Sequence, residues 1–120
     1  MSSEGGEPRK LIALEVLRER QTFRFTFEEE GIQREGFLAW QEGNVVAYEN
    51  LCRHLPLSLD YGDGRFFTPD GRHFICQTHG ALYEPGSGLC VAGPCEGASL
   101  KRLAVEVRGG SIWFLGRASE

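Results

Sequence analysis

Residues 36–49 read GFLAWQEGNVVAYE and predict a β-hairpin. Two runs of strand-forming residues, 36–41 and 44–49, lie on either side of Glu42-Gly43. A two-residue connection that contains glycine is typical of a tight turn between antiparallel strands, because glycine adopts the positive φ angles of such turns. The stretch therefore favours a β structure built from short, locally connected strands.

Other segments repeat this arrangement of short strands and turns. Thr22–Phe27 (TFRFTF) places three phenylalanines on one face of a strand. Pro69-Asp70-Gly71 and Gly109-Gly110 are turn sequences between further pairs of strand-like segments. The segment Lys10–Leu17 suits either a strand or a short helix, and we assign it to a strand. The flanking pairs are Arg65–Thr68 with His73–Cys76 and Leu103–Arg108 with Ser111–Leu115. About eight short strands predict an all-β fold, a small antiparallel sandwich or barrel.

Length, composition and charge limit the classes of function. With 120 residues, the chain suits one domain, and we expect a disordered tail at residues 1–9 followed by a single domain at 10–120. The formal net charge of −4 argues against a nucleic-acid partner, because no basic excess is present to bind phosphates. Apolar runs are too short for a membrane span, and the polar residues 1–10 do not form a secretory signal. We therefore expect a cytoplasmic protein with no membrane partner.

Two Cys/His pairs carry the predicted chemistry. Cys52 and His54 follow the 44–49 strand, and after 21 intervening residues Cys76 and His79 lie where another strand ends. A [2Fe–2S] cluster needs four protein ligands, and it could take one iron on the two thiolates and the other on the two imidazoles. Zinc accepts the same ligand types, so a zinc-stabilised interaction module is an alternative.

From about Gly36 to Leu115 the sequence resembles the Rieske iron–sulfur family, and within it the ferredoxin-like subgroup. The resemblance is carried by CRHLP (52–56), CQTHGALYEP (76–85) and GPCEG (93–97). It implies a Rieske-type β domain in which two loops hold one [2Fe–2S] cluster and a third loop covers it. The implied ligands are Cys52, His54, Cys76 and His79, and the residues expected beside the cluster are Leu55, Gly80, Ala81, Tyr83, Gly93 and Pro94.

The chain also departs from the respiratory members of that family. Leu57 and Thr78 occupy the positions of two cysteines that form a disulfide there, so this bridge is absent. Ala81 replaces a serine that donates a hydrogen bond to a cluster sulfide, whereas Tyr83 matches a tyrosine of that subgroup. Since each lost donor disfavours the reduced, more negative cluster, we expect a reduction potential near the bottom of the Rieske range.

The resemblance implies a soluble one-electron carrier that works between a reductase and a terminal oxygenase or another redox enzyme. An electron-transfer component is favoured over an enzyme in its own right, because only His73 would remain to build a catalytic iron site. The alternative within the family is a small Rieske-like subunit of a larger redox enzyme, such as a nitrite reductase. Cys90 and Cys95 have the wrong spacing for an all-cysteine cluster and are expected to be free, half-buried thiols, with a disulfide between them as the alternative.

Overall fold

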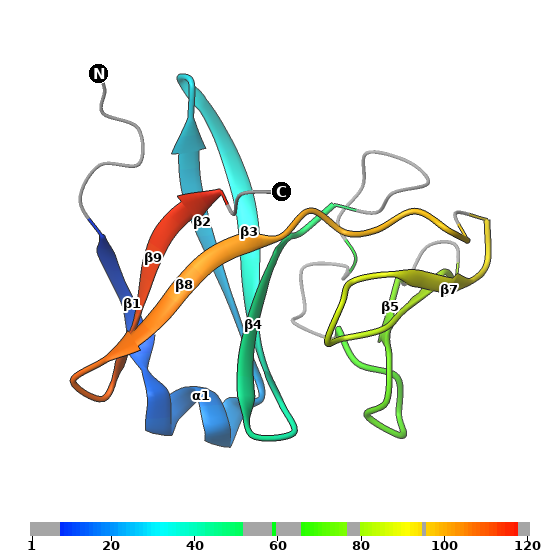
Figure 1. The fold of residues 1–120 in the computed structure, drawn as a ribbon, viewed down its shortest axis with the longest axis horizontal. Helices are drawn as coiled ribbons and strands as arrows, with labels where there is room; N and C mark the ends of the chain where they lie inside the picture. Colours follow the sequence, from blue (N-terminus) through cyan, green and yellow to red (C-terminus); the bar gives the residue numbers. More distant parts are fainter. Residues whose placement is uncertain (1–7, 52–58, 60–65, 77–79, 95, 118–120) are drawn as a thin grey trace. The chain divides into compact units, whose positions relative to one another are not determined.

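The computed structural model describes residues 8–51, 59, 66–76, 80–94 and 96–117. These residues form antiparallel strands, turns and a short helix (Figure 1). They belong to two compact units: unit 1 comprises residues 1–49 and 102–120, and unit 2 comprises residues 50–101. The predicted all-β class is confirmed, and within the described residues the sheets are open rather than closed into a barrel.

Unit 1 contains two three-stranded antiparallel sheets with the orders β2-β3-β4 and β1-β9-β8. The first sheet consists of β2 (Thr22–Glu29), β3 (Ile32–Gln41) and β4 (Asn44–Glu49), and the second of β1 (Arg9–Ala13), β8 (Leu103–Arg108) and β9 (Ser111–Arg117). Tyr48 at the end of β4 and Arg102 just before β8 form an isolated antiparallel bridge. The chain therefore leaves unit 1 and returns to it at neighbouring positions.

The core of unit 1 lies between these sheets and explains the phenylalanine pattern. Phe25 and Phe27 are 7% and 5% exposed, and their rings lie 5.4 and 5.2 Å from that of Phe114 on β9. Leu17, Leu38, Ala47, Leu103 and Ile112 complete the buried cluster. Burial of these apolar side chains is the main stabilising contribution to unit 1.

Both predicted glycine hairpins of unit 1 are present. In the first, Gln41 pairs with Asn44 across Glu42 and Gly43, whose φ angles are +50° and +82°. In the second, Arg108 pairs with Ser111 across the two glycines 109 and 110. Positive φ at both central residues gives the turn a twist that matches that of the strands it joins.

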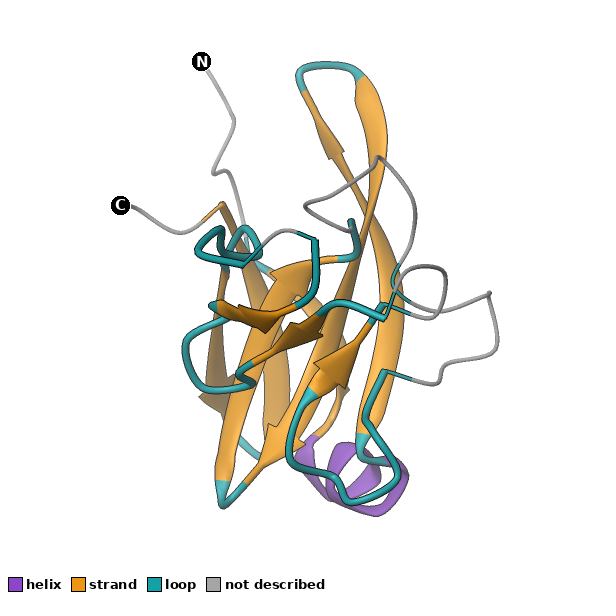
Figure 2. Ribbon diagram, turned by 90° about the vertical axis from the view of Figure 1, so that its right-hand side faces the viewer, coloured by secondary structure: helices purple, strands orange, loops and turns teal. Residues whose placement is uncertain are grey.

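The strand expected at Lys10–Leu17 is correct only in its first half. β1 ends at Ala13, and helix α1 (Leu14–Arg20) follows; it is the purple element in Figure 2. Leu17 is fully buried and Leu14 packs against the same core, whereas the positions between them are exposed. A spacing of three residues between apolar positions belongs to a helix, and it is too short a pattern to recognise in sequence.

Unit 2 is organised around a small antiparallel sheet of very short strands, β5 (Phe74–Ile75), β6 (Leu82–Tyr83) and β7 (Cys90–Ala92), in that order. The strand expected at Arg65–Thr68 is reduced, in the part that is described, to one bridge between Phe67 and Phe74. Within the described residues, no helix has the length and apolar character needed to cross a membrane.

Candidate metal centre

The candidate metal centre belongs to unit 2, and Cys76 is the one predicted ligand that the structure describes. Cys52, His54 and His79 lie outside the described residues, as does the neighbouring Leu55. Among the four predicted ligands, the structure therefore defines the surroundings of Cys76 alone.

Cys76 is completely buried at the end of β5, and both of its backbone polar groups are used. Its N–H donates to the carbonyl of Ala81 at 2.9 Å, and its carbonyl accepts from the N–H of Gly80 at 2.8 Å. Gly80 has a φ of +75°, a value at which a side chain is strained. These two hydrogen bonds fix the backbone that carries the thiol.

The two buried residues that follow Gly80 hold this turn against the small sheet. Ala81 and Tyr83 are both 0% exposed. Tyr83 pairs with Phe74 on one side and with Cys90 on the other, so it occupies the middle strand of the sheet. The methyl group of Ala81 offers no hydrogen-bond donor to a bound group.

The loop after β7 approaches the same turn closely. Gly93 has a φ of +100°, and a Cβ atom placed there would lie 2.8 Å from the Cα of Ala81. Only a residue without a side chain allows the two backbones to come this near. The neighbouring Pro94 is exposed.

Hydrogen bonds to Cys90 close the base of this loop. The N–H of Gly97 donates to the carbonyl of Cys90 at 3.0 Å, and the N–H of Cys90 donates to the carbonyl of Ala98 at 2.7 Å. The thiol of Cys90 donates to the carbonyl of Ala92 at 3.2 Å. Cys90 is 1% exposed and so more deeply buried than expected, and Cys95 lies outside the described residues. The loop at Gly93 is therefore held in place by main-chain bonds.

The described part of the site fits an iron–sulfur cluster. A buried thiol on a fixed turn supplies a soft ligand of the kind that iron–sulfur clusters and zinc both accept. Cys76 and Ala81 are both completely buried, which suits a redox group kept away from water.

Asn50 is a residue of this region that the sequence analysis did not single out. It is 3% exposed, and its side-chain Oδ1 accepts a hydrogen bond from the N–H of Leu59 at 2.9 Å. A polar residue at the end of a predicted strand is ordinarily expected at the surface, and no sequence pattern indicates that its amide accepts a hydrogen bond from Leu59.

The turn around Asp70 is a separate, exposed feature of unit 2. The hydroxyl of Thr68 donates to the Asp70 carboxylate at 2.6 Å and the N–H of Arg72 donates to it at 3.0 Å. These hydrogen bonds hold the pKa of Asp70 below its ordinary value. His73, expected at the surface, is half-buried, and its N–H donates to Thr68 Oγ1 at 3.3 Å.

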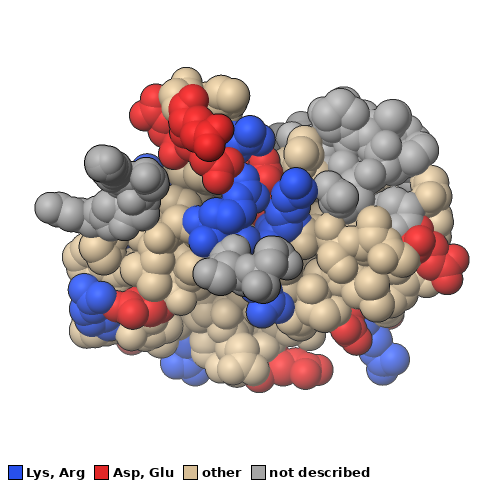
Figure 3. Space-filling view, turned by 45° about the horizontal axis from the view of Figure 1, so that its top comes forward, with Lys and Arg blue, Asp and Glu red and all other residues tan. Residues whose placement is uncertain are grey.

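A charge cluster of Glu29, Arg34, Glu49 and Arg117 lies in unit 1, where acidic and basic side chains meet near the β2–β3 hairpin (Figure 3). Arg117 contacts Glu29 at 2.6 Å and the 4% exposed Glu49 at 2.8 Å. These bonds, above all the one to Glu29, raise the pKa of Arg117. Arg34 also contacts Glu49, at 3.2 Å.

Comparison with known proteins gives a family for this arrangement. A family model described as the Rieske [2Fe-2S] domain matches residues 10–107. The oxidoreductase NdmD of Pseudomonas putida is 34% identical over 83 residues, which is 62% of this chain and 13% of NdmD. The chain thus spans about an eighth of the length of that relative.

Solved structures share the fold. A ferredoxin–oxygenase complex of carbazole 1,9a-dioxygenase contains a chain that matches with a TM-score of 0.72 and 22% identity, over 94% of this chain and 96% of that one. The ferredoxin of carbazole 1,9a-dioxygenase from Nocardioides aromaticivorans IC177 matches with a TM-score of 0.69 and 23% identity, over 93% of this chain and 100% of that one. The Rieske protein PetC3 of Synechocystis PCC 6803 matches with a TM-score of 0.61 and 16% identity, over 91% and 98% of the two chains.

Proposed function

The chain belongs to the Rieske [2Fe-2S] domain family, and we propose that it carries single electrons from a reductase to a terminal oxygenase or a similar redox enzyme. A Rieske [2Fe-2S] domain holds one [2Fe–2S] cluster. When bound, the cluster supplies a reversible one-electron couple, whose potential is raised by histidine ligation relative to an all-cysteine cluster. Reduction adds one negative charge to a chain whose formal net charge is −4.

The proposed ligands are Cys52 and Cys76 on one iron and His54 and His79 on the other. The observation that supports them is the buried thiol of Cys76, held on a turn by its hydrogen bonds to Gly80 and Ala81. A thiol that is shielded from water is a suitable metal ligand, because binding of the metal removes its proton.

The residues around this turn have structural roles in the proposal. Gly80 gives the chain the conformation that the turn needs, and Gly93 brings the covering loop against Ala81. Tyr83 anchors the turn in the sheet, and Pro94 and Leu55 are proposed to border the cluster. Their proposed common effect is to fix the position of the ligands.

The partners are proposed from the character of the matched proteins. One of the matched structures is a complex of an oxygenase with a ferredoxin, and its matched chain corresponds to nearly the whole length of this one. NdmD favours a second candidate, because this chain corresponds to a small part of that oxidoreductase. In that case the chain acts as the Rieske component of a larger redox enzyme.

We also propose that residues 10–120 work as one Rieske-type domain, since the family model spans parts of both units. A cytoplasmic location is proposed on the grounds that Leu57 and Thr78 stand where the respiratory proteins have a disulfide. Cell fractionation with an antibody against the chain tests the location.

Electron paramagnetic resonance of the reduced protein, with iron and sulfide analysis, tests the cofactor. We expect about two irons and two sulfides per chain and the low average g-value of mixed Cys/His ligation. Cys76→Ser should lose this signal, whereas Cys90→Ser, at an equally buried thiol of the same unit, should keep it. A colourless protein with one zinc per chain would refute the electron-transfer proposal.

The two partner arrangements are separated by purification from the native source. A free carrier should run as a small protein and be reduced by a separate flavin-containing or iron–sulfur reductase. A stable association with a larger redox subunit through every purification step would favour the second candidate over the first.

A further inference from the structure

The small sheet of unit 2 has a buried face and an exposed apolar face. Phe74, Tyr83 and Cys90 are paired across its three strands and are at most 1% exposed, so they mark the buried face. Because side chains alternate between the two faces of a strand, Leu89 and Val91, on either side of Cys90, point the other way. Each of these two side chains is 39% exposed.

Further apolar side chains continue the exposed face across the other strands. Ile75 on β5 pairs with Leu82 on β6, and Leu82 pairs with Ala92 on β7. All three are partly exposed. Paired residues of antiparallel strands have their side chains on one face of the sheet, so these three share a face with Leu89 and Val91. We call these five residues the β7 patch.

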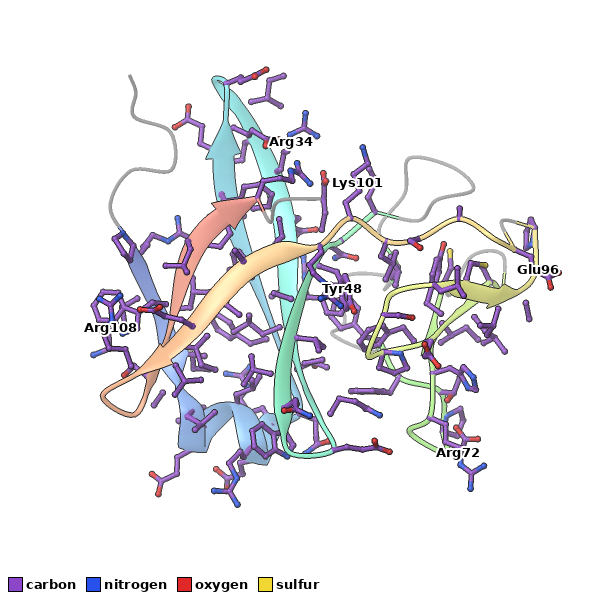
Figure 4. All side chains as sticks on the ribbon, viewed as in Figure 1. Arg34, Tyr48, Arg72, Glu96, Lys101 and Arg108 are labelled. Atoms are coloured by element: carbon purple, nitrogen blue, oxygen red, sulfur yellow. The ribbon has the colours of Figure 1, made fainter. Side chains whose placement is uncertain are left out.

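The segment that carries most of the β7 patch has little charge, although a quarter of the residues in the whole chain are charged. From Gly86 to Ser99 the sequence contains one charged residue, Glu96, which lies in the turn beyond β7 (Figure 4). A partner that placed charges against this segment would lose their hydration and gain few ion pairs in return. The charge distribution therefore fits a partner whose contact face is uncharged and apolar.

The main chain of β7 is already hydrogen-bonded on both sides. On the side of β6, the N–H of Glu84 donates to the carbonyl of Leu89 at 2.8 Å. On the other side, the N–H of Cys90 donates to Ala98 at 2.7 Å and the carbonyl of Cys90 accepts from Gly97 at 3.0 Å. Strand addition needs an unpaired edge, so a partner contacts the β7 patch through its side chains. The same bonds hold the patch in place before a partner binds, which reduces the entropy cost of binding.

The β7 patch is also continuous with the candidate metal centre. β7 ends at Ala92, and a Cβ atom on the next residue, Gly93, would lie 2.8 Å from the Cα of Ala81. The carbonyl of Ala81 accepts the hydrogen bond from the N–H of Cys76, the described ligand. Since electron transfer slows steeply with distance, an electron carrier needs a partner surface near its cluster. The β7 patch meets this requirement.

We propose that the β7 patch is a docking surface for an electron-transfer partner that presents an uncharged, apolar face to it. The inference rests on the proposed function and adds to it the chemistry of the contact between carrier and partner. An apolar contact is not screened by salt, so the affinity should be nearly independent of ionic strength.

Photo-crosslinking in cells of the native source identifies the partner. The photoreactive residue p-benzoylphenylalanine is introduced in place of Val91 and, as a control, in place of Val107. Val107 is a 48% exposed valine on β8 of unit 1 and lies between the charged residues Glu106 and Arg108. We expect a redox protein that contains iron or a flavin to crosslink at position 91 and not at position 107. Mass spectrometry identifies the crosslinked protein.

Calorimetric titration with that redox protein, once purified, measures the affinity. The double variant Leu89→Ser, Val91→Ser should raise Kd about tenfold or more, because it removes the two most exposed apolar side chains of the contact. Val107→Ser should change Kd less than about twofold. For the unaltered chain, Kd should change less than about threefold between about 50 and 500 mM NaCl.

Electron paramagnetic resonance of each reduced variant shows whether the cluster is kept. We expect the same signal in all variants, because the substituted side chains are exposed. If the double variant does not fold, Val91→Thr takes its place, because it keeps the β-branched shape and adds a hydroxyl group to the contact. A rise in Kd of about threefold is then expected.

The outcomes separate the docking surface from the function on which it rests. An unaltered protein without a [2Fe–2S] signal overturns the proposed function. If that signal is present, the docking surface alone is overturned when no redox protein crosslinks at position 91, when the variants of the β7 patch bind with unchanged Kd, or when salt weakens binding tenfold. A crosslink between two copies of this chain also contradicts the proposal, because the β7 patch would then be a dimer interface.

Discussion

Gly93 lies where two segments of unit 2 approach each other closely. An added Cβ would lie 2.8 Å from the Cα of Ala81, and φ is +100°. Gly97 has a similar φ of +96°, but nothing lies within 4 Å of the position where its Cβ would be. A side chain at either glycine would strain the backbone, but only a side chain at Gly93 would also clash with a neighbouring segment.

We predict that Gly93→Ala lowers the free energy of unfolding by about 1–3 kcal/mol more than Gly97→Ala does, because backbone must move to relieve the contact. Urea unfolding of both variants measures the difference, and iron content reports whether the loop still covers the cluster. Equal destabilisation in the two variants would mean that the close contact between Gly93 and Ala81 does not add to the cost of the substitution.

Ala81 bears on the reduction potential of the proposed cluster. It is fully buried beside Cys76 and offers no side-chain donor. A hydroxyl at this position can donate to the cluster and favours the reduced state, since reduction adds negative charge.

We predict that Ala81→Ser raises the potential by several tens of millivolts to about 100 mV, and that the unaltered protein lies near −150 mV, at about the lower end of the Rieske range. Redox titration followed by visible circular dichroism measures both. Ala47→Ser, at a buried alanine of unit 1, is the control and should leave the potential unchanged. A potential that falls in Ala81→Ser contradicts the donor argument.

Among the strands, the charge cluster at Arg117 ties β9 to β2 and β4. Arg117 bonds Glu29 and Glu49, and its guanidinium also lies 5.9 Å from the ring centre of Phe27. Arg34, which contributes to the same cluster, and Arg108, at the β8–β9 turn, lie at different ends of unit 1 (Figure 4). The ion pair of Arg108 with Glu106 is exposed.

We predict that Arg117→Met lowers the free energy of unfolding by about 1–3 kcal/mol. The reason is that the buried carboxylate of Glu49 would then be paired with Arg34 but no longer with Arg117. The control Arg108→Met should cost about 0.5 kcal/mol or less, as expected for an exposed pair. Thermal and urea unfolding give both values. Similar costs for the two variants would show that burial of Glu49 does not matter.

Strands with strong local signals could be predicted from the sequence. The hairpin around Glu42-Gly43 and the stripe of Phe25 and Phe27 depend on alternation and turn residues within a few positions, and both are present. The start of α1 at Leu14 could not be predicted, because LEVL fits a buried strand as well as a helix and only the packed core selects the helix.

The sequence indicates the parts of the candidate site that depend on residue type, and it does not indicate those that depend on tertiary contact. Cys76 is identified by its place in a Cys/His pattern, and its burial agrees with that role. The hydrogen bond of Asn50 to Leu59 joins residues nine positions apart without any periodicity, so no local pattern indicates it. β6 and β7, with two and three residues, are likewise too short to carry a periodic signal.

The molecule as a whole is stabilised unevenly. Unit 1 has strands of five to ten residues and its own apolar cluster, whereas the strands of unit 2 have two or three residues. Short strands supply few ladder hydrogen bonds, so the bound cluster should contribute a large share of the stability of unit 2.

We predict that removal of the metal increases hydrogen exchange in unit 2 and leaves unit 1 nearly unchanged. The amides of Cys76, Gly80 and Cys90 should lose about tenfold or more in protection, while those of Leu38 and Ile112 should not. Exchange measured by mass spectrometry on protein with and without metal compares the two units. A uniform loss over both units would show that they unfold together.

The bridge between Tyr48 and Arg102 has an evolutionary consequence. The two residues are paired across the strands, and the Arg102 guanidinium stacks 5.7 Å from the centre of the tyrosine ring. The chain between these two residues starts and ends at adjacent positions. It can therefore gain or lose residues, or be exchanged by recombination, while the strands of unit 1 keep the same ends. Evolution can thus vary the sequence and length of unit 2 without changes in the sheets of unit 1.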